Sequence, residues 1–289
     1  MTEALRIERV LVIGAGTMGA GIAQVLAQAE LQVALADIDP EARQRALGTI
    51  ERGLRLAAAK GWLGNRDPAA LLERVRPVGS VAEEAAGADL VIEAVPERMD
   101  LKREIFAELG RHCQPHALLA TNTSSLPVTA IAGASGRPER VLGLHFFNPP
   151  PLMPLVEIVR GERTAEEAVE AARAFVTRLG KEPIVVRDVP GFATSRLGLA
   201  LGLEAMRMVE EGVASPADID RAMELGYRHP MGPLKLTDLV GLDVRLDIAE
   251  TLHRELGERF RPPQILRRMV RAGKLGRKSG EGFYRYDAP

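Results

Sequence analysis

Short apolar runs alternate with longer segments of helical periodicity through roughly the first two thirds of the chain. Each run ends at glycine, proline or polar residues, which is typical of strands buried on both faces of a parallel sheet. After Val189 the strand pattern stops until the last residues, and helical patterns follow one another. The pattern therefore predicts an α/β domain over residues 1–187 and an all-α domain over residues 188–289. The expected strands are residues 7–13, 32–36, 88–97, 117–120, 142–147, 154–159 and 184–186. The expected helical segments include residues 40–75, with a break near residues 61–64, and residues 100–110, 164–180, 192–212, 244–260 and 264–272.

The first strand leads directly into a glycine turn and then into a helix. In the turn, Gly14-Ala15-Gly16-Thr17-Met18-Gly19, the three glycines permit a tight turn, close approach to a pyrophosphate, and helix-on-strand packing. The next strand ends at Asp37, whose carboxylate would accept hydrogen bonds from ribose hydroxyls and repel a 2′-phosphate. Asp39 is expected to cap the following helix instead. We therefore predict a Rossmann-type, doubly wound, mostly parallel sheet that binds NAD; the alternative is a tight turn without a ligand.

Two later apolar runs each contain one residue that can carry charge. His145 lies at the end of residues 142–147, and Glu157 lies inside residues 154–159. A buried carboxylate is costly unless it is paired, and an imidazole is the obvious partner for it. The segment from Asn148 to Pro151 forms turns readily, so it could bring the two strands side by side. The pair would suit a general base near neutral pH, or it could be a buried ion pair without chemistry.

Two further polar groups have two interpretations each. Thr121 to Ser125 follow a predicted strand, where they could cap the next helix or contact a ligand at the carboxyl end of the sheet. Arg52, Arg55 and Lys60 form a cationic group, either a solvated helix face or a site for a ligand's phosphates.

The predicted helical domain also leaves alternatives open. The helix over residues 192–212 is apolar on more than one face, which suits either a homodimer interface or the core of the same chain. The tail, residues 276–284, is rich in glycine and basic residues. It fits a mobile surface loop or a strap over a phosphate.

Composition and charge narrow the possible functions. The 289 residues carry a net charge of −1, so the total charge gives no reason to expect nucleic acid or a membrane as partner. The single cysteine, Cys113, excludes an internal disulfide and fits a reducing compartment. We find no leader and no run of about 18 apolar residues, and we expect a cytoplasmic protein. The five histidines lack metal-ligand spacing, so we expect no metal.

Seven motifs occur in one order over residues 6–286: GAGTMG, NTSS, GLHFFNP, LVEIV, PGF, HPMGP and GEGFY. In this combination the sequence resembles the 3-hydroxyacyl-CoA dehydrogenase family, of the stand-alone type that includes 3-hydroxybutyryl-CoA dehydrogenases. The resemblance implies reversible, NAD-dependent oxidation of (S)-3-hydroxyacyl-CoA in fatty-acid beta-oxidation or butanoate-type metabolism. From the apolar helix over residues 192–212 we also expect a homodimer formed through the C-terminal helical domain. The alternatives are an NAD-dependent dehydrogenase of a free hydroxy or sugar acid, and a non-catalytic NAD-binding or structural relative.

The resemblance also assigns roles to single residues. His145 would be the catalytic base, Glu157 its partner, Ser124 the ligand of the substrate hydroxyl and Lys60 a contact to CoA. The implied NAD contacts are Gly14, Gly16, Thr17, Met18, Gly19, Asp37, Glu97, Lys102, Ser124, Asn148 and Lys278.

Two positions depart from the family pattern. Gly53 replaces the serine that accompanies the CoA-binding lysine, which puts one CoA contact in doubt. Ser195 stands where the family usually has a substrate-side asparagine. Because serine reaches less far, we expect Ser195 to act through a water molecule or to have lost that role.

Overall fold

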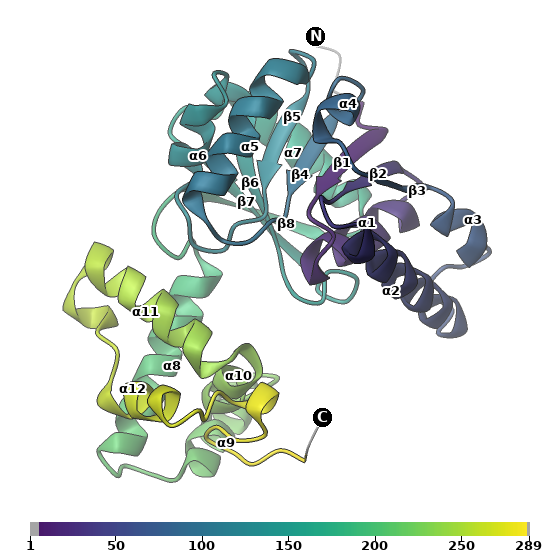
Figure 1. Ribbon diagram of the computed structural model, residues 1–289. Helices are drawn as coiled ribbons and strands as arrows, with labels where there is room; N and C mark the ends of the chain where they lie inside the picture. The colour runs from purple at the N-terminus through teal and green to yellow at the C-terminus, as the bar shows by residue number, and fades with distance from the viewer. Residues whose placement is uncertain (1–5, 288–289) are drawn as a thin grey trace. The chain divides into compact units, whose positions relative to one another are not determined.

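The structure is a computed structural model that describes residues 6–287 (Figure 1). The chain divides into two compact units, with the boundary between Asp188 and Val189, one residue after the boundary expected from the pattern. The first unit has two hydrophobic clusters and the second unit has one. No helix within residues 6–287 is both long enough and apolar enough to cross a membrane.

The first unit is built on one eight-stranded sheet in the order β3-β2-β1-β4-β5-β6-β7-β8. Neighbouring strands are parallel except for β6 and β7, which are antiparallel. The chain runs outward from β1 to β3 and then returns to β4 on the other side of β1. This reversal creates a crevice at the carboxyl ends of β1 and β4, where doubly wound sheets bind ligands. The strands are β1 Arg9–Ile13, β2 Gln32–Ala36, β3 Val75–Val78, β4 Leu90–Glu93, β5 Leu118–Thr121, β6 Val141–Phe146, β7 Leu155–Arg160 and β8 Glu182–Arg187.

Helices cover both faces of this sheet, which confirms the predicted doubly wound α/β fold (Figure 1). Successive residues of β1 point to opposite faces, so Val10 and Val12 belong to one cluster while Leu11 and Ile13 belong to the other. The first cluster includes residues of α1, α2 and α7, and the second includes residues of α4, α5 and α6. The bounds are α1 Thr17–Gln28, α2 Pro40–Ala59, α3 Pro68–Leu72, α4 Val81–Ala85, α5 Met99–His112, α6 Val128–Ala134 and α7 Glu166–Arg178, with a 3-10 helix, η1, at Pro138–Arg140.

Strand β3 is an element that the sequence pattern missed. Its four residues, Val75–Val78, follow the stretch expected to be helical over residues 40–75. They pair in parallel with Val33–Ala36 of β2 at the edge of the sheet. An edge position tolerates Pro77, which cannot donate a backbone hydrogen bond.

The second unit consists of helices, as predicted. Leu199, Leu203 and Met206 of α8 are fully buried in its cluster, whereas the side chain of Leu197 is 72% exposed. Part of the apolar surface of α8 is therefore core of its own unit. The helices are α8 Thr194–Glu210, α9 Pro216–Gly226, α10 Pro233–Val240, α11 Leu242–Leu256 and α12 Gln264–Arg271, with 3-10 helices η2 Glu258–Phe260 and η3 Arg277–Ser279.

The glycine-rich tail is held on the helices of its own unit. The buried carboxylate of Asp238 accepts hydrogen bonds from the backbone N–H groups of Phe283 and Tyr284, both at 2.9 Å. The Tyr284 hydroxyl donates to Asp220, which is also buried, at 2.6 Å. A Cβ atom at Gly282 would lie 2.1 Å from the Asp238 carboxylate, so the close approach requires glycine. The tail is therefore an ordered strap over α9 and α10.

Candidate active site

The three glycines of the first turn have three different surroundings. Gly14 has φ of +103°, and a Cβ atom there would lie 2.7 Å from the carbonyl oxygen of Ala94. A Cβ atom at Gly19 would lie 1.7 Å from the carbonyl oxygen of Gly14, so this glycine permits α1 to pack on β1. Gly16 has no neighbour within 4 Å of the corresponding position, and no side chain caps the start of α1. The turn therefore leaves open space at a helix N-terminus, which fits the pyrophosphate of a dinucleotide.

Asp37 supports this turn from the end of β2. One carboxylate oxygen accepts from the Ala15 N–H at 2.7 Å, and the other accepts from the Asp39 N–H at 3.0 Å. The side chain is half-buried. It holds the turn in place through these contacts, in addition to its predicted contact with ribose. Asp39 caps α2 as expected, because its side chain accepts from the Glu41 N–H at 2.9 Å.

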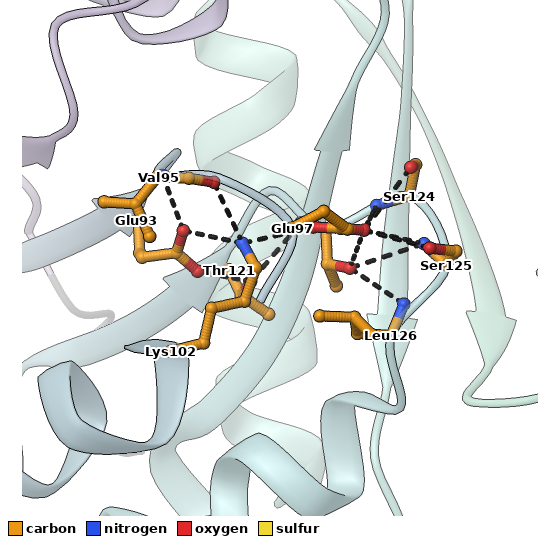
Figure 2. Close-up of polar contacts among 9 residues, drawn as sticks. Glu93, Val95, Glu97, Lys102, Thr121, Ser124, Ser125 and Leu126 are labelled. Atoms are coloured by element: carbon orange, nitrogen blue, oxygen red, sulfur yellow. Dashed lines mark hydrogen bonds and ion pairs between the residues drawn. The ribbon is translucent and has the colours of Figure 1, made fainter. Parts of the chain in front are cut away.

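Glu93 and Lys102 form a buried ion pair in the next part of the site (Figure 2). Glu93 ends β4 and is fully buried; one of its oxygens accepts from Lys102 Nζ and from the Val95 N–H, both at 2.7 Å. Its other oxygen accepts from the Thr121 hydroxyl at 2.7 Å. Lys102 lies in the first turns of α5, and its side chain is only 1% exposed. The pair therefore joins the ends of β4 and β5 to α5.

Glu97 continues this network toward the surface. Its Oε2 lies 3.3 Å from Lys102 Nζ, and its Oε1 accepts from the N–H groups of Ser124 at 3.0 Å and Ser125 at 3.2 Å (Figure 2). The hydroxyls of Thr123 and Ser125 donate to the same oxygen. Burial alone would raise the pKa of Glu97, but the Lys102 ammonium and these hydrogen bonds outweigh it and lower that pKa. Glu97 is therefore an ionised carboxylate, and it holds the loop that carries Ser124.

The small polar residues of this loop do not cap the following helix. Helix α6 begins at Val128 after Pro127, and no side chain of the loop caps it. The first N–H groups of α6, those of Val128 and Thr129, donate to the Asp188 carboxylate at 3.0 and 2.7 Å. The capping alternative for Thr121 to Ser125 is therefore wrong. The hydroxyl groups of this segment donate to Glu93 or Glu97, and the Asn122 side chain accepts from the Phe146 N–H.

His145 and Glu157 face each other across the antiparallel strands β6 and β7. His145 Nδ1 lies 2.7 Å from Glu157 Oε2, Glu157 is fully buried, and the side chain of His145 is 8% exposed. The ring of Phe147 lies against the imidazole with a centroid distance of 4.5 Å. A carboxylate at Nδ1 favours the tautomer with a proton on that nitrogen and stabilises the imidazolium. The predicted contact is therefore present, with a geometry that suits a proton acceptor.

A pocket of about 320 Å³ brings His145 together with several other predicted residues. It contains groups from α1, from the ends of β4, β5 and β6, and from the loops that follow those strands. The Asn122 side chain in its wall accepts from the Phe146 N–H at 2.9 Å, which joins β5 to β6. The pocket is lined by Met18, Ala94, Val95, Glu97, Asn122, Ser124, His145, Phe146, Phe147 and Asn148.

Lys60 lies outside this pocket. It is exposed at the end of α2, with Nζ 4.7 Å from the centroid of the Trp62 ring. Its neighbour Arg55 pairs with Glu51 at 2.6 Å. At Gly53 a Cβ atom would lie 2.1 Å from the buried Gln24 side chain, which occupies the space that a serine would need.

Two predicted site residues belong to the second unit. Ser195 lies in the first turn of α8 and is half-buried. Lys278 lies in the strap, where its ammonium pairs with the Asp243 carboxylate at 2.6 Å. Within residues 6–287, no cluster of three or more histidine, cysteine or acidic side chains could hold a metal ion.

Sequence reasoning did not single out Glu93 or Phe147, and it included Asn122 only as a member of the polar group Thr121 to Ser125. A signal for Glu93 was available, because it is a lone charged residue in the apolar run Leu90–Val95, just as Glu157 is in its own run. Asn122 and Phe147 depend on contacts between strands, and their positions in the sequence do not reveal those contacts.

Comparisons with known proteins point to one family. The chain matches the family description "3-hydroxyacyl-CoA dehydrogenase, NAD binding domain" over residues 9–189 and the "C-terminal domain" of the same family over residues 191–286. It is 46% identical to a probable 3-hydroxybutyryl-CoA dehydrogenase of Bacillus subtilis, covering 98% of this chain and 99% of that protein. It is 44% identical to 3-hydroxyadipyl-CoA dehydrogenase of Escherichia coli, covering 98% of this chain and 60% of that protein. The crystal structure of (S)-3-hydroxybutyryl-CoA dehydrogenase from Ralstonia eutropha matches with a TM-score of 0.94 and 40% identity, over 98% of this chain and 100% of that one.

Proposed function

The chain belongs to the 3-hydroxyacyl-CoA dehydrogenase family, and we propose on this basis that it oxidises (S)-3-hydroxyacyl-CoA thioesters to 3-ketoacyl-CoA, reversibly and with NAD. One observation carries the assignment of the reaction to this site. The carboxylate-backed imidazole of His145 lines the same pocket as Ser124 and as Met18 of the glycine turn. A proton acceptor and a dinucleotide-binding turn in one pocket are what oxidation of an alcohol requires.

The residues of the chain divide the work of this reaction. NAD, when bound, supplies the hydride acceptor at its nicotinamide ring. His145 takes the proton of the substrate's C3 hydroxyl, and the Glu157 carboxylate stabilises the imidazolium that results. The Ser124 hydroxyl holds the substrate oxygen and fixes its distance from the imidazole. In the reverse direction the imidazolium of His145 returns the proton to the 3-keto oxygen.

The remaining predicted contacts fall into direct and indirect ones. Glu97 and Asn148 line the pocket and are proposed to contact NAD directly, together with the residues of the glycine turn. Lys102 is buried beneath Glu97, so we assign it an indirect role through the position and charge of that carboxylate. Lys60 offers an exposed cation beside Trp62 and is proposed to bind a phosphate of CoA.

Two roles are proposed for the second unit. We propose that Ser195 contacts the substrate and that Lys278 contacts NAD. We also propose a homodimer formed through this unit, because the unit exposes several large apolar side chains that a partner subunit would remove from water. Those side chains are Leu197, Leu225, Tyr227, Leu239, Val240 and Val244. We place the enzyme in the cytoplasm, in fatty-acid beta-oxidation or butanoate-type metabolism.

The reaction is tested by following NADH oxidation with acetoacetyl-CoA, free acetoacetate and a series of 3-ketoacyl-CoA chain lengths that includes one ω-carboxylated member. We expect kcat/KM to be at least ~100-fold higher for the thioester than for the free acid, because only the thioester offers phosphates to Lys60. Equal values would favour a dehydrogenase of free hydroxy acids. NADH binding without turnover of any substrate would favour a non-catalytic relative.

A further inference from the structure

The connection between β6 and β7 is poor in backbone hydrogen-bond donors. It comprises residues 147–154, and four of its eight residues, at positions 149, 150, 151 and 154, are proline. Proline has no N–H group, so the loop has few donors with which to satisfy its own carbonyl groups. Within the loop, the N–H groups of Leu152 and Met153 both donate to the carbonyl of Pro149, at 3.0 and 3.1 Å.

Lys181, which precedes β8, supplies the missing donors. Its Nζ donates to the carbonyl oxygens of Pro150 at 2.7 Å and Met153 at 2.6 Å. The next residue, Glu182, donates its backbone N–H to the carbonyl of Pro154 at 2.8 Å. Residues 181 and 182 therefore bind three carbonyl groups of one loop.

The charge of Lys181 is unusual for its position. The residue is only 9% exposed, and no carboxylate in residues 6–287 lies within ion-pair distance of its ammonium. Burial accordingly lowers the pKa of Lys181. A buried ammonium costs free energy that carbonyl dipoles offset only in part. A neutral side chain would fill the same space at a lower cost in free energy. What lysine adds at this position is the two hydrogen bonds to the loop.

The loop held by Lys181 contacts the active site on two sides. Its first residues, Phe147 and Asn148, line the pocket, and the Phe147 ring lies against His145. The buried ring of Pro150 packs on α1, where a Cβ atom at Gly21 would lie 2.7 Å from it. A shift of this loop would therefore move pocket groups relative to both the imidazole and the helix that follows the glycine turn.

We propose that Lys181 is a positioning residue for the dehydrogenase reaction, because its ammonium fixes the loop of residues 147–154 and thereby places Phe147 and Asn148 beside His145. The inference rests on the proposed function. Misplacement of catalytic groups by about 1 Å can cost up to roughly 10²-fold in rate. A rate effect is therefore expected even though Lys181 contacts neither the pocket nor its ligands.

The test compares Lys181→Met with a matched variant, Arg137→Met. Arg137 also donates to two carbonyl oxygens, those of Gln114 at 2.6 Å and Leu109 at 3.3 Å, but it lies near the amino-terminal end of β5, away from the pocket. Activity is measured with acetoacetyl-CoA and NADH at a temperature well below the unfolding midpoints of both variants. We expect Lys181→Met to lower kcat about 10-fold. Arg137→Met should stay within about 2-fold of the wild type. If both variants are destabilised but keep normal kcat, Lys181 is only structural and the proposal is wrong.

A second variant covers the case in which Lys181→Met does not fold. Gly21→Ala adds a methyl group 2.7 Å from the Pro150 ring, which is closer than van der Waals contact, so it pushes the same loop from its other side without touching Lys181. Assayed well below the unfolding midpoint of this variant, kcat should fall several-fold, and unchanged kcat would overturn the proposal. The wild-type enzyme is assayed in the same series. An inactive wild type would refute the proposed function, whereas an active wild type with unaffected variants would refute only the role of Lys181.

Discussion

Two buried ion pairs lie in the first unit, one at the end of β4 and one between β6 and β7, and they differ in one respect that matters. Glu93–Lys102 and Glu157–His145 have the same separation of 2.7 Å, and both carboxylates are fully buried. The Lys102 ammonium, however, is 1% exposed and is surrounded by Glu93, Glu97 and the Val95 carbonyl. His145 instead lines the pocket that holds Ser124. Distance and burial thus do not distinguish the two pairs, whereas access to the pocket does, and for this reason we propose a role in the reaction only for Glu157–His145.

The chemistry of the two cations points the same way. A lysine amine keeps its proton at neutral pH, and a carboxylate beside it serves mainly to offset a permanent charge. An imidazole can gain and lose a proton near neutral pH, so a carboxylate beside it can stabilise a charge that forms only during a reaction. Removing the carboxylate should therefore lower mainly the stability in the Glu93–Lys102 pair, and mainly kcat in the Glu157–His145 pair.

The largest expected effect is on folding, in Glu93→Gln. This change leaves the buried Lys102 without its nearest carboxylate, so we expect the free energy of unfolding to fall by about 3 kcal/mol. The value lies at the low end for a broken buried pair because Glu97 remains 3.3 Å from the ammonium. Urea unfolding measures the loss, and kcat of the folded fraction should stay within about 3-fold. A stable variant with a large loss of kcat would reverse the distinction between the pairs.

Glu157→Gln should show the reverse pattern. His145 can remain neutral, so no permanent charge is left unpaired and the unfolding free energy should fall by less than about 1 kcal/mol. The imidazolium loses its carboxylate, and we expect kcat to fall roughly 30-fold, or about 2 kcal/mol in activation free energy. Steady-state kinetics with acetoacetyl-CoA and NADH measure this. An unchanged kcat would mean that Glu157 has only a structural role.

Asp37 has a structural role and a proposed role in ligand binding, because it holds the glycine turn and is also proposed to bind the ribose. In Asp37→Ala we expect the Kd for NAD to rise about 10-fold, or about 1.4 kcal/mol, and discrimination against NADP to weaken. Titration of the protein with both cofactors measures the two effects. If selectivity stays intact while both affinities fall equally, the carboxylate acts only through the turn.

The smallest expected effect concerns the pH dependence of stability through Glu97. The pKa of Glu97 is lower in the folded protein than its ordinary value of 4.5, so its contribution to stability is complete above about pH 4.5. That contribution is lost as the pH falls through the folded-state value. The side chain is 35% exposed, so screening limits the effect to less than about 1 kcal/mol. Urea unfolding between about pH 6 and 3 should show a steeper loss in the wild type than in Glu97→Gln; parallel curves would contradict this.

The sequence was most informative where an element is defined by neighbouring residues. The strand, glycine turn and helix around Gly14 follow from local pattern, and the fold class follows from the order of apolar runs. The contact between His145 and Glu157 was also predictable, because each is the only residue of its apolar run that can carry charge. A short connection between the two runs leaves few alternatives to direct pairing.

Features that depend on distant segments could not be predicted in this way. Strand β3 is short and contains Arg76 and Pro77, and it is a strand because β2 offers it a free edge. The cap of α6 is Asp188, 60 residues away from Val128. Lys181 likewise has no local sequence signal, because its role depends on a loop about 30 residues earlier in the chain. These contacts exist only once the sheet has formed.

Whether His145 is the group that accepts the substrate proton can be measured in the variant His145→Gln. The measurement is kcat with acetoacetyl-CoA and NADH, combined with a titration of NADH binding to the same variant. If His145 is the proton acceptor, kcat falls at least ~100-fold while the Kd for NADH stays within about 2-fold of the wild type. Near-normal turnover with intact NADH binding would contradict it.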